Sequence, residues 1–438
     1  MRGPDRKRAP GMNGDSAAES GQAQITLPPG VALDRAMSRE LHGTFWLPAA
    51  TAVFPIQPMT RSLDEVAGPQ EVELRPRVTP PWRRRIRRAY NLRMAMKELP
   101  MVPSGMAVQL EPATIEELSA EIRDLAERRD AVILAHNYEV PEIQDVADFT
   151  GDSLGLSRQA AATDASTVAF CGVHFMAETA SILSPDKKIL IPDLDAGCSL
   201  ADSINADQLR EWKAKYPGAM VVMYVNTSAE VKAETDYCCT SSNAVSVVRH
   251  IWQEHGPETE ILFGPDMWLG QFVARETGLS EDLERAARFH VWDGECHVHA
   301  GIRPDDITRT REEHPEAEFL IHPECGCATQ AMEYVAAGDI DAEGVHMLST
   351  SGMIDHVEKN PEGSFVIATE NSMLYPIQKI APEANLIEAN RMAFCKYMKM
   401  ITLPKLRDSL RDMKFEVKVD EQLARRARLP IERMVSIG

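Results

Sequence analysis

Between residues 114 and 400, short apolar runs alternate with segments in which apolar side chains recur at helical spacing. The first helical segment is 114–125, where Thr114 and Glu117 have the spacing of a helix N-cap. Each apolar run is short, which is typical of a buried strand. Such alternation predicts parallel sheets with right-handed crossover connections. The predicted strands are 131–135, 167–170, 188–192, 219–223, 260–263, 289–292, 318–321, 345–348, 364–368 and 385–388.

The order strand, loop, helix and strand occurs three times, and each occurrence ends close to a cysteine. We therefore predict an α/β protein with three similar α/β/α sandwich domains around one central site. Functional groups of parallel sheets lie just past the carboxyl ends of strands, the predicted position of His136, Tyr224 and His322. The predicted boundaries are 114–205 for domain 1, 206–302 for domain 2, 303–400 for domain 3 and 401–438 for a C-terminal tail with a helix.

The first 110 residues have a different composition. They hold 13 of the 28 prolines and show no sustained hydrophobic period. They also carry 16 Lys/Arg against 10 Asp/Glu, a net charge of +6. We expect 1–110 to be an irregular, Pro-rich, basic extension with a short helix near 83–98. No apolar segment follows its basic start, so we expect no secretory signal and a cytoplasmic protein.

The rest of the chain is strongly acidic. The net charge of the 438 residues is −19, which leaves −25 for residues 111–438. The negative charge of residues 111–438 disfavours general nucleic-acid binding. No apolar run in the sequence is long enough to span a membrane. An anionic substrate must therefore be held by local groups, such as helix N-termini, hydroxyls and histidines.

Three of the eight cysteines are almost evenly spaced, because 98 residues separate Cys198 from Cys296 and 99 separate Cys296 from Cys395. If each domain gives one thiolate to a shared metal centre, one coordination position stays free, which favours chemistry over a structural role. In an iron–sulfur cluster, such a free position makes one iron a Lewis acid. Spacing alone leaves a second interpretation open, since single cysteines also occur as small buried side chains.

The other five cysteines are better interpreted as packing or local structural residues: Cys171, Cys238, Cys239, Cys325 and Cys327. Cys325 and Cys327 are the exception to consider, because they could bind zinc together with His322. A second dense pair of ligands is missing there. A non-catalytic zinc protein is thus an alternative from another functional class.

The chain resembles the quinolinate synthase family, whose members act in NAD biosynthesis. Eleven motifs occur in the order typical of that family and cover residues 114–405. They are His136-Asn137-Tyr138, Gly151-Asp152-Ser153, Met176-Ala177-Glu178-Thr179, Ala196-Gly197-Cys198, Tyr224-Val225-Asn226-Thr227, Thr240-Ser241-Ser242-Asn243, Gly264-Pro265-Asp266, Cys296 with His297-Val298-His299, His322-Pro323-Glu324, Ser349-Thr350-Ser351-Gly352 and Cys395.

The resemblance implies a fold of three domains related by pseudo-threefold symmetry and a [4Fe-4S] cluster held by Cys198, Cys296 and Cys395. It implies that the cluster is a Lewis acid in the condensation of iminoaspartate with dihydroxyacetone phosphate to quinolinate, phosphate and water. It suggests a functional link to an enzyme that oxidises aspartate, and no nucleic-acid or membrane partner. Some members have a C-x-x-C-x-x-C run at the third cysteine, but Ala389 and Met392 stand at those positions here.

The resemblance also implies the substrate contacts, which are His136, Ser153, Tyr224, Val225, Asn226, Ser241, His322, Pro323, Glu324 and Thr350. Residues two apart on a strand end point to the same side, so Tyr224 and Asn226 can reach one ligand. The same spacing makes His322 and Glu324 an acid–base pair, with Glu324 as general base and His322 and Tyr224 orienting the three-carbon substrate.

Two further alternatives stay open. An iron–sulfur hydro-lyase for another hydroxy acid would use the same open iron without a second, phosphorylated substrate. A nucleic-acid-binding module based on the basic N-terminal arm is disfavoured by the acidic body.

Overall fold

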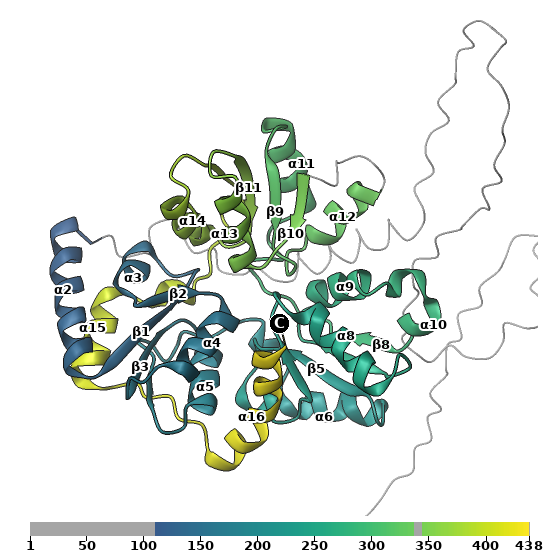
Figure 1. Ribbon diagram of the computed structural model, residues 1–438, viewed down its shortest axis with the longest axis horizontal. Coiled ribbons are helices and arrows are strands. Elements are labelled where there is room, and N and C mark those ends of the chain that lie inside the picture. The colour runs from purple at the N-terminus through teal and green to yellow at the C-terminus, as the bar shows by residue number, and fades with distance from the viewer. Residues whose placement is uncertain (1–109, 337–343, 438) are drawn as a thin grey trace, which may run out of the picture. The chain divides into compact units, whose positions relative to one another are not determined.

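The computed structural model describes residues 110–336 and 344–437 (Figure 1). The predicted extension 1–110 lies outside the described residues except for Leu110. None of the described helices has both the length and the apolar character needed to cross a membrane.

The strands of the described residues form three four-stranded sheets, and their order is β2-β1-β3-β4, β6-β5-β7-β8 and β10-β9-β11-β12. All pairs of neighbouring strands are parallel. One topology therefore occurs three times, which confirms the predicted α/β class with three similar units. Whether a threefold axis relates them stays a prediction. The strands are β1 Ala131–His136, β2 Phe149–Gly151, β3 Thr167–Cys171, β4 Lys188–Leu190, β5 Met220–Tyr224, β6 Tyr237–Cys239, β7 Ile261–Gly264, β8 Phe289–Val291, β9 Glu318–Ile321, β10 Val345–Met347, β11 Ser364–Ala368 and β12 Asn385–Glu388.

The central strands are nearly continuous apolar runs because helices cover both faces of each sheet. The residues of β3 and β7 are all buried, for example. The pattern of apolar runs locates ten strands to within one or two residues and misses β2 and β6. Each of these is three residues long and lies at the edge of its sheet.

The helices fill the connections between strands. They are α2 Pro112–Arg128, α3 Pro141–Val146, α4 Ser153–Ala162, α5 His174–Leu183, η1 Ala201–Ser203, α6 Ala206–Lys215, α7 Ala229–Lys232, α8 Ala244–His255, α9 Met267–Glu276, η2 Leu279–Glu281, α10 Leu283–Ala286, α11 Pro304–Glu313, α12 Ala328–Ala336, α13 Thr350–Lys359, η4 Asn371–Met373, α14 Leu374–Ile380, η5 Met398–Met400, α15 Leu403–Asp412 and α16 Glu421–Ser436. The N-cap predicted at Thr114 is wrong, because α2 begins at Pro112, whose fixed φ suits the first turn.

The two C-terminal helices return to the first and second sheets. Helix α15 packs against α2, and α16 packs against α5, α7 and β6. Near the end of α16, the Asn243 side chain donates hydrogen bonds to the carbonyls of Met434 and Ile437 at 2.9 and 2.7 Å. These bonds satisfy carbonyl groups that a helix end leaves without partners.

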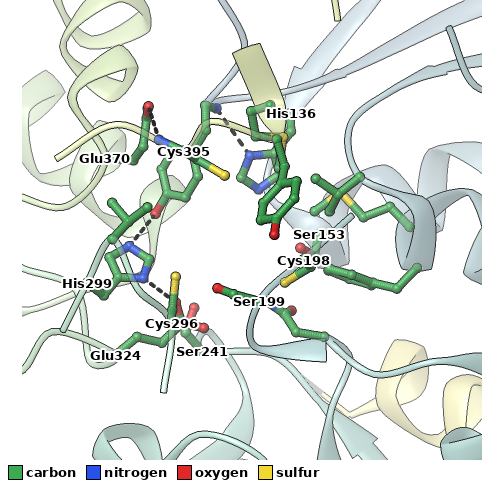
Figure 2. A pocket seen from close by; sticks show the side chains of 18 of the residues that line it. His136, Ser153, Cys198, Ser199, Ser241, Cys296, His299, Glu324, Glu370 and Cys395 are labelled. Carbon is green, nitrogen blue, oxygen red and sulfur yellow. Dashed lines mark hydrogen bonds and ion pairs between the residues drawn. The ribbon is translucent and has the colours of Figure 1, made fainter. Parts of the chain in front are cut away.

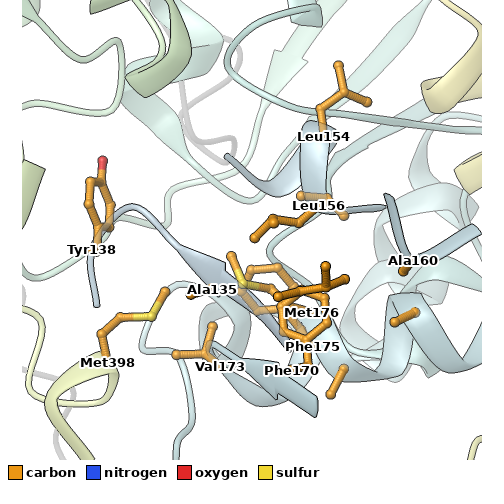
Figure 3. Packing of buried hydrophobic residues seen from close by; sticks show 14 of the residues in the cluster. Ala135, Tyr138, Leu154, Leu156, Ala160, Phe170, Val173, Phe175, Met176 and Met398 are labelled. Atoms are coloured by element: carbon orange, nitrogen blue, oxygen red, sulfur yellow. The ribbon is translucent and has the colours of Figure 1, made fainter. Parts of the chain in front are cut away.

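All strands of the three sheets fall within the predicted ranges 114–205, 206–302 and 303–400. The domain boundaries themselves stay a prediction. In the first unit, Phe170 of β3 and Phe175 and Met176 of α5 belong to one apolar cluster, which also includes Tyr138 and Met398 (Figure 3). The core of the first unit thus reaches side chains that also line the central cavity.

Candidate functional site

One cavity receives side chains from the carboxyl ends of strands of all three sheets. The predicted site residues that line it are His136, Ser153, Cys198, Tyr224, Asn226, Ser241, Cys296, His322, Glu324, Thr350 and Cys395. Val225 and Pro323, also predicted as contacts, are buried and do not line it. In the segments 224–226 and 322–324, the first and third side chains reach the cavity and the middle one does not. This agrees with the alternation of side chains along an extended chain.

The three evenly spaced cysteines enter this cavity from three directions, and Figure 2 shows their sulfur atoms pointing into it. The same tight turn follows each of them. The carbonyl of the cysteine accepts the backbone N–H four residues later, at 3.0 Å for Cys198, 2.9 Å for Cys296 and 3.2 Å for Cys395. Backbone N–H groups two or three residues later also donate to each sulfur atom. The chain therefore builds one type of anion-accepting turn three times.

These thiols are protonated when nothing is bound to them. Burial raises the pKa of Cys198 to about 12 and that of Cys395 to about 11, and raises that of Cys296 well above its usual value. The thiols also raise one another's pKa values through charge repulsion. A shared cationic centre would lower the pKa values of all three thiols, because the metal replaces their protons and its positive charge offsets the repulsion between the thiolates.

The spacing of the three sulfur atoms indicates the size of that centre. One zinc ion bound by three thiolates needs sulfur atoms within about 4 Å of one another, since Zn–S bonds are about 2.3 Å long. Among the described residues, the sets whose ligand atoms all lie within 4.8 Å of one another do not include these cysteines. A centre of several metal ions therefore suits the three thiols better than one ion does.

A buried carboxylate lies beside the thiols. Glu324 Oε2 is 2.6 Å from His299 Nδ1 and 3.6 Å from His322 Nδ1. Burial alone would raise the pKa of Glu324, but His299, His322 and the hydroxyl of Tyr224 lower it to about 2. Glu324 Oε1 is buried and has no hydrogen-bond partner. The carboxylate is thus ionised and keeps one oxygen free to accept a proton or a hydrogen bond.

Two imidazoles of the cavity are neutral at neutral pH. Burial lowers the pKa values of both His136 and His322 to about 3. His136 Nδ1 accepts the backbone N–H of Tyr138 at 3.1 Å, so its Nε2 carries the proton. In the same way, His322 Nδ1 accepts the backbone N–H of Glu324 at 3.4 Å, and its Nε2 lies 3.1 Å from Ser241 Oγ. Both rings therefore present an N–H donor without a full positive charge.

Several hydroxyl and amide groups complete the cavity wall. Burial and the charge of nearby Glu324 raise the pKa of Tyr224 well above its usual value, so its hydroxyl is protonated. Asn226 Oδ1 is buried without a partner, so it can accept a donor from a ligand. Ser153 is the first residue of α4, but Asp152 caps the helix, which leaves the Ser153 hydroxyl for the cavity.

A second group of residues was not predicted. His299 Nε2 lies 3.1 Å from Thr369 Oγ1 and 3.3 Å from the Tyr138 hydroxyl, which is 2.5 Å from Thr369 Oγ1. This chain of hydrogen bonds leads to Glu324 through His299. The signal for His299 was present in the motif after Cys296, whereas nothing in the sequence pattern indicates Thr369.

The third cysteine has its own support. Glu370 Oε1 accepts the backbone N–H of Cys395 at 3.1 Å and pairs with Lys399 Nζ at 2.8 Å. Lys399 also donates to the Tyr138 carbonyl at 2.5 Å and to Ser372 Oγ at 2.6 Å. Since Tyr138 follows β1 and Glu370 follows β11, this lysine links two of the units at the cavity.

The remaining cysteines are separate from the cavity lining and fully buried, as expected for packing residues. Cys325 donates its S–H to the Ala368 carbonyl at 3.0 Å and packs with Cys327 in the apolar core of the third unit. His322, the proposed third zinc ligand in that alternative, is instead grouped with His299 and Glu324. The described geometry therefore gives the zinc alternative at Cys325 and Cys327 no support.

Known proteins similar to this chain belong to one family. Residues 120–436 match the family model described as quinolinate synthetase A protein. Among curated proteins, the quinolinate synthase of Mycobacterium sp. strain KMS is 53% identical over 326 residues, which are 74% of this chain and 94% of that protein. The quinolinate synthases of Mycobacterium tuberculosis strain H37Rv and Mycolicibacterium paratuberculosis strain K-10 are both 52% identical, over 323 and 320 residues. The first match spans 74% of this chain and 89% of the relative, and the second spans 73% of this chain and 88% of the relative.

Proposed function

The chain belongs to the quinolinate synthetase A family, and on that premise we propose that it condenses iminoaspartate with dihydroxyacetone phosphate to quinolinate, phosphate and water. The observation that carries the proposal is the meeting of three equivalent cysteine turns and an ionised, partly unpaired glutamate in one cavity. The reaction would be a step of de novo NAD biosynthesis in the cytoplasm. Iminoaspartate would come from an enzyme that oxidises aspartate, and we propose no nucleic-acid or membrane partner.

We propose that Cys198, Cys296 and Cys395 hold a [4Fe-4S] cluster. The donor set supports this, since it has three thiols from three sheets, spaced too widely for one ion. N–H groups that donate to each sulfur would also stabilise cluster-bound thiolates. When bound, the cluster would supply one Lewis-acidic iron without a protein ligand.

Substrate carboxylates would be held by neutral donors. His136 offers an Nε2–H whose direction is fixed by the hydrogen bond at Nδ1, and Ser153 offers a hydroxyl beside the N-terminus of α4. Thr350 begins α13, and its Oγ1 accepts a hydrogen bond from the Asn137 amide at 3.1 Å, which fixes it against the first unit. Helix N-termini favour anions, so Ser153 and Thr350 are placed to bind negative groups of either substrate.

Proton transfer would centre on Glu324. Its Oε1 accepts a proton from the three-carbon substrate, while Oε2 stays paired with His299. Asn226 Oδ1 would accept the imine or amine N–H of the other substrate. His322 and Tyr224, bonded to Ser241 and Glu324, would orient the three-carbon substrate against the carboxylate.

The test uses anaerobically purified protein. Iron and sulfide are counted, and iminoaspartate and dihydroxyacetone phosphate are added singly and together while quinolinate is measured. We expect quinolinate only with both substrates, and product formation from a single hydroxy acid would instead support a hydro-lyase.

The first variant is Glu324→Gln. It keeps the shape of the side chain but removes the base, so turnover should fall about 10²–10⁴-fold while iron content and visible absorbance stay unchanged. Normal turnover in this variant would rule out Glu324 as the base.

A further inference from the structure

A second group of potential metal ligands lies in the third unit, away from the central cavity. Glu318 Oε2 is 3.1 Å from His346 Nε2 and 2.8 Å from His356 Nε2. All three ligand atoms lie within 4.8 Å of one another. None of the three residues lines the central cavity.

The fold brings these residues together from three elements. Glu318 begins β9, and His346 lies in the neighbouring edge strand β10, paired in register with Leu320. Since Glu318 and Leu320 are two residues apart, Glu318 and His346 share one face of the sheet. Helix α13 supplies His356, whose ring packs edge-on against Phe365 of β11, the partner of Glu318 in the register. The cluster is therefore a product of sheet register and helix packing.

The local geometry suits a divalent transition-metal ion. A tetrahedral zinc site has Zn–N and Zn–O distances of about 2.0–2.2 Å, which place neighbouring ligand atoms about 3.4 Å apart. The two measured Glu–His separations are within about 0.6 Å of that value. The two rings lie 4.2 Å apart with a tilt of 43°, so both Nε2 atoms converge on the same carboxylate oxygen.

The types of donor atom limit which metal ions can bind here. Two imidazoles and one carboxylate suit zinc, iron, cobalt or nickel, whereas magnesium and calcium prefer oxygen ligands. The three side chains are 24–31% exposed, so an ion has a path from solvent and a water can take the fourth position. Without a metal ion, the Nε2–H groups of His346 and His356 would both donate to the same oxygen, Glu318 Oε2.

We propose that Glu318, His346 and His356 form a second metal site, which takes a divalent transition-metal ion such as zinc and ties α13 to β9 and β10. The same elements deliver residues to the central cavity from their other ends. Thr350 begins α13, and His322 follows β9 directly. An ion at this site therefore fixes the position of the helix that carries Thr350 relative to the strand that carries His322. The proposal does not depend on the proposed reaction.

The test measures zinc bound to the anaerobic holoprotein. Samples are dialysed against zinc and then against buffer, and zinc and iron are counted in the same sample. We expect about one zinc per chain in the wild type, and its loss in His346→Gln and in His356→Gln. The control is His255→Gln, at the exposed end of α8, which should keep the zinc. Unchanged iron in all samples shows that the central site is intact.

The ligand type is a second, independent readout. X-ray absorption at the zinc edge should show nitrogen and oxygen neighbours at about 2.0–2.2 Å. Sulfur neighbours at about 2.3 Å would place the zinc on cysteines and overturn the proposal. Equal zinc content in wild type and His346→Gln, or no zinc in the wild type, would also overturn it.

Thermal unfolding distinguishes a folded variant that has lost the zinc site from a variant that binds no zinc because it is misfolded. Zinc should raise the unfolding midpoint of the wild type and of His255→Gln, because it binds the folded state. Glu318→Gln keeps an acceptor for the rings but removes the charge, so it should fold and lose the zinc-dependent shift. A full shift in Glu318→Gln would contradict the carboxylate's role as a ligand.

Discussion

Glu324 is ionised at neutral pH although it is buried, because two imidazoles and a tyrosine hydroxyl surround it. A carboxylate in an apolar site would otherwise be protonated. Its partner His299 is held in turn by Thr369 and Tyr138. The protonation state of the proposed base therefore depends on residues that need not touch substrate.

Replacing His299 should change the pH dependence of turnover. In His299→Asn, burial acts on Glu324 with less compensation, so the pKa of Glu324 rises from about 2. The protonated acid cannot accept a proton, and below the new pKa the rate should fall about tenfold per pH unit. A pH–rate profile of kcat for wild type and variant measures the shift of the acid limb toward higher pH.

The control is His255→Gln, whose profile should match that of the wild type. An acid limb that stays in place in His299→Asn, with the iron content intact, would show that His299 does not set the protonation of Glu324.

At the residue scale, the sequence indicates side chains that follow buried strands and belong to known motifs, such as His322 and Cys198. It does not indicate Lys399, whose bond to the Tyr138 carbonyl joins the first and third units, or Glu370, which supports Cys395 within the third unit. The Lys399–Tyr138 contact joins residues 261 positions apart, and no local spacing encodes it.

At the scale of elements, the loop before Cys296 is more tightly packed than the loop before Cys198. A Cβ on Gly294 would lie 2.4 Å from the Pro265 carbonyl and 2.5 Å from Ser203 Oγ. A Cβ on Gly197 would meet only ordinary contacts, at 3.7 Å or more. The two glycines thus differ in their tolerance of a side chain, although each lies within two residues before a cysteine turn.

Gly294→Ala should displace the loop that carries Cys296, since the added Cβ would meet the backbone carbonyl of Pro265 rather than the end of a flexible side chain. We expect a loss of about 1–3 kcal/mol in the free energy of unfolding and a lower iron content. Gly197→Ala is the matched control and should keep both. Iron analysis and urea unfolding measure the difference, and equal behaviour of the two variants would contradict the packing argument.

The periodic apolar pattern predicts elements well where a strand is buried on both faces. For the buried strands β9 and β11 the predicted and observed bounds agree. The bounds of β12 agree as well, although this edge strand is only partly buried. The edge strands β2 and β6 escape prediction because polar residues flank each of them directly, Asp148 and Asp152 for β2 and Asp236 and Thr240 for β6, so neither forms an extended apolar run.

At the scale of the whole molecule, the matched part of the chain corresponds to nearly complete relatives. The family model covers 120–436, and 326 residues of this chain account for 94% of one relative. The relatives therefore have little counterpart for the remaining quarter of the chain.

A chain that starts at Met106 should accordingly keep its iron content and its turnover. Within 110–336 and 344–437, the residues that line the central cavity all lie between His136 and Met398. Side-by-side iron counts and quinolinate assays of the full and shortened proteins check this. A loss of iron or activity in the shortened chain would give the extension a role in the site.

The convergence of the three sheets was inferred from cysteine spacing and motif order, and the shared cavity agrees with it. The relative placement of the units could not be derived from periodicity, because each unit satisfies its own backbone hydrogen bonds within its own sheet. Two kinds of contact join them: side-chain contacts at the cavity, such as those of Asn137 and Lys399, and an apolar cluster that includes buried residues of all three sheets and of α16.

The wide separation of the three thiols along the chain has a consequence during synthesis on the ribosome. At about 5–20 residues per second, Cys395 emerges some 10–40 s after Cys198. During that interval the nascent polypeptide displays one or two sulfhydryls with no partner to complete a cofactor cage. If the proposed cluster is held by these three cysteines, its insertion must wait for translation to be nearly complete, and a prematurely terminated product could not retain it.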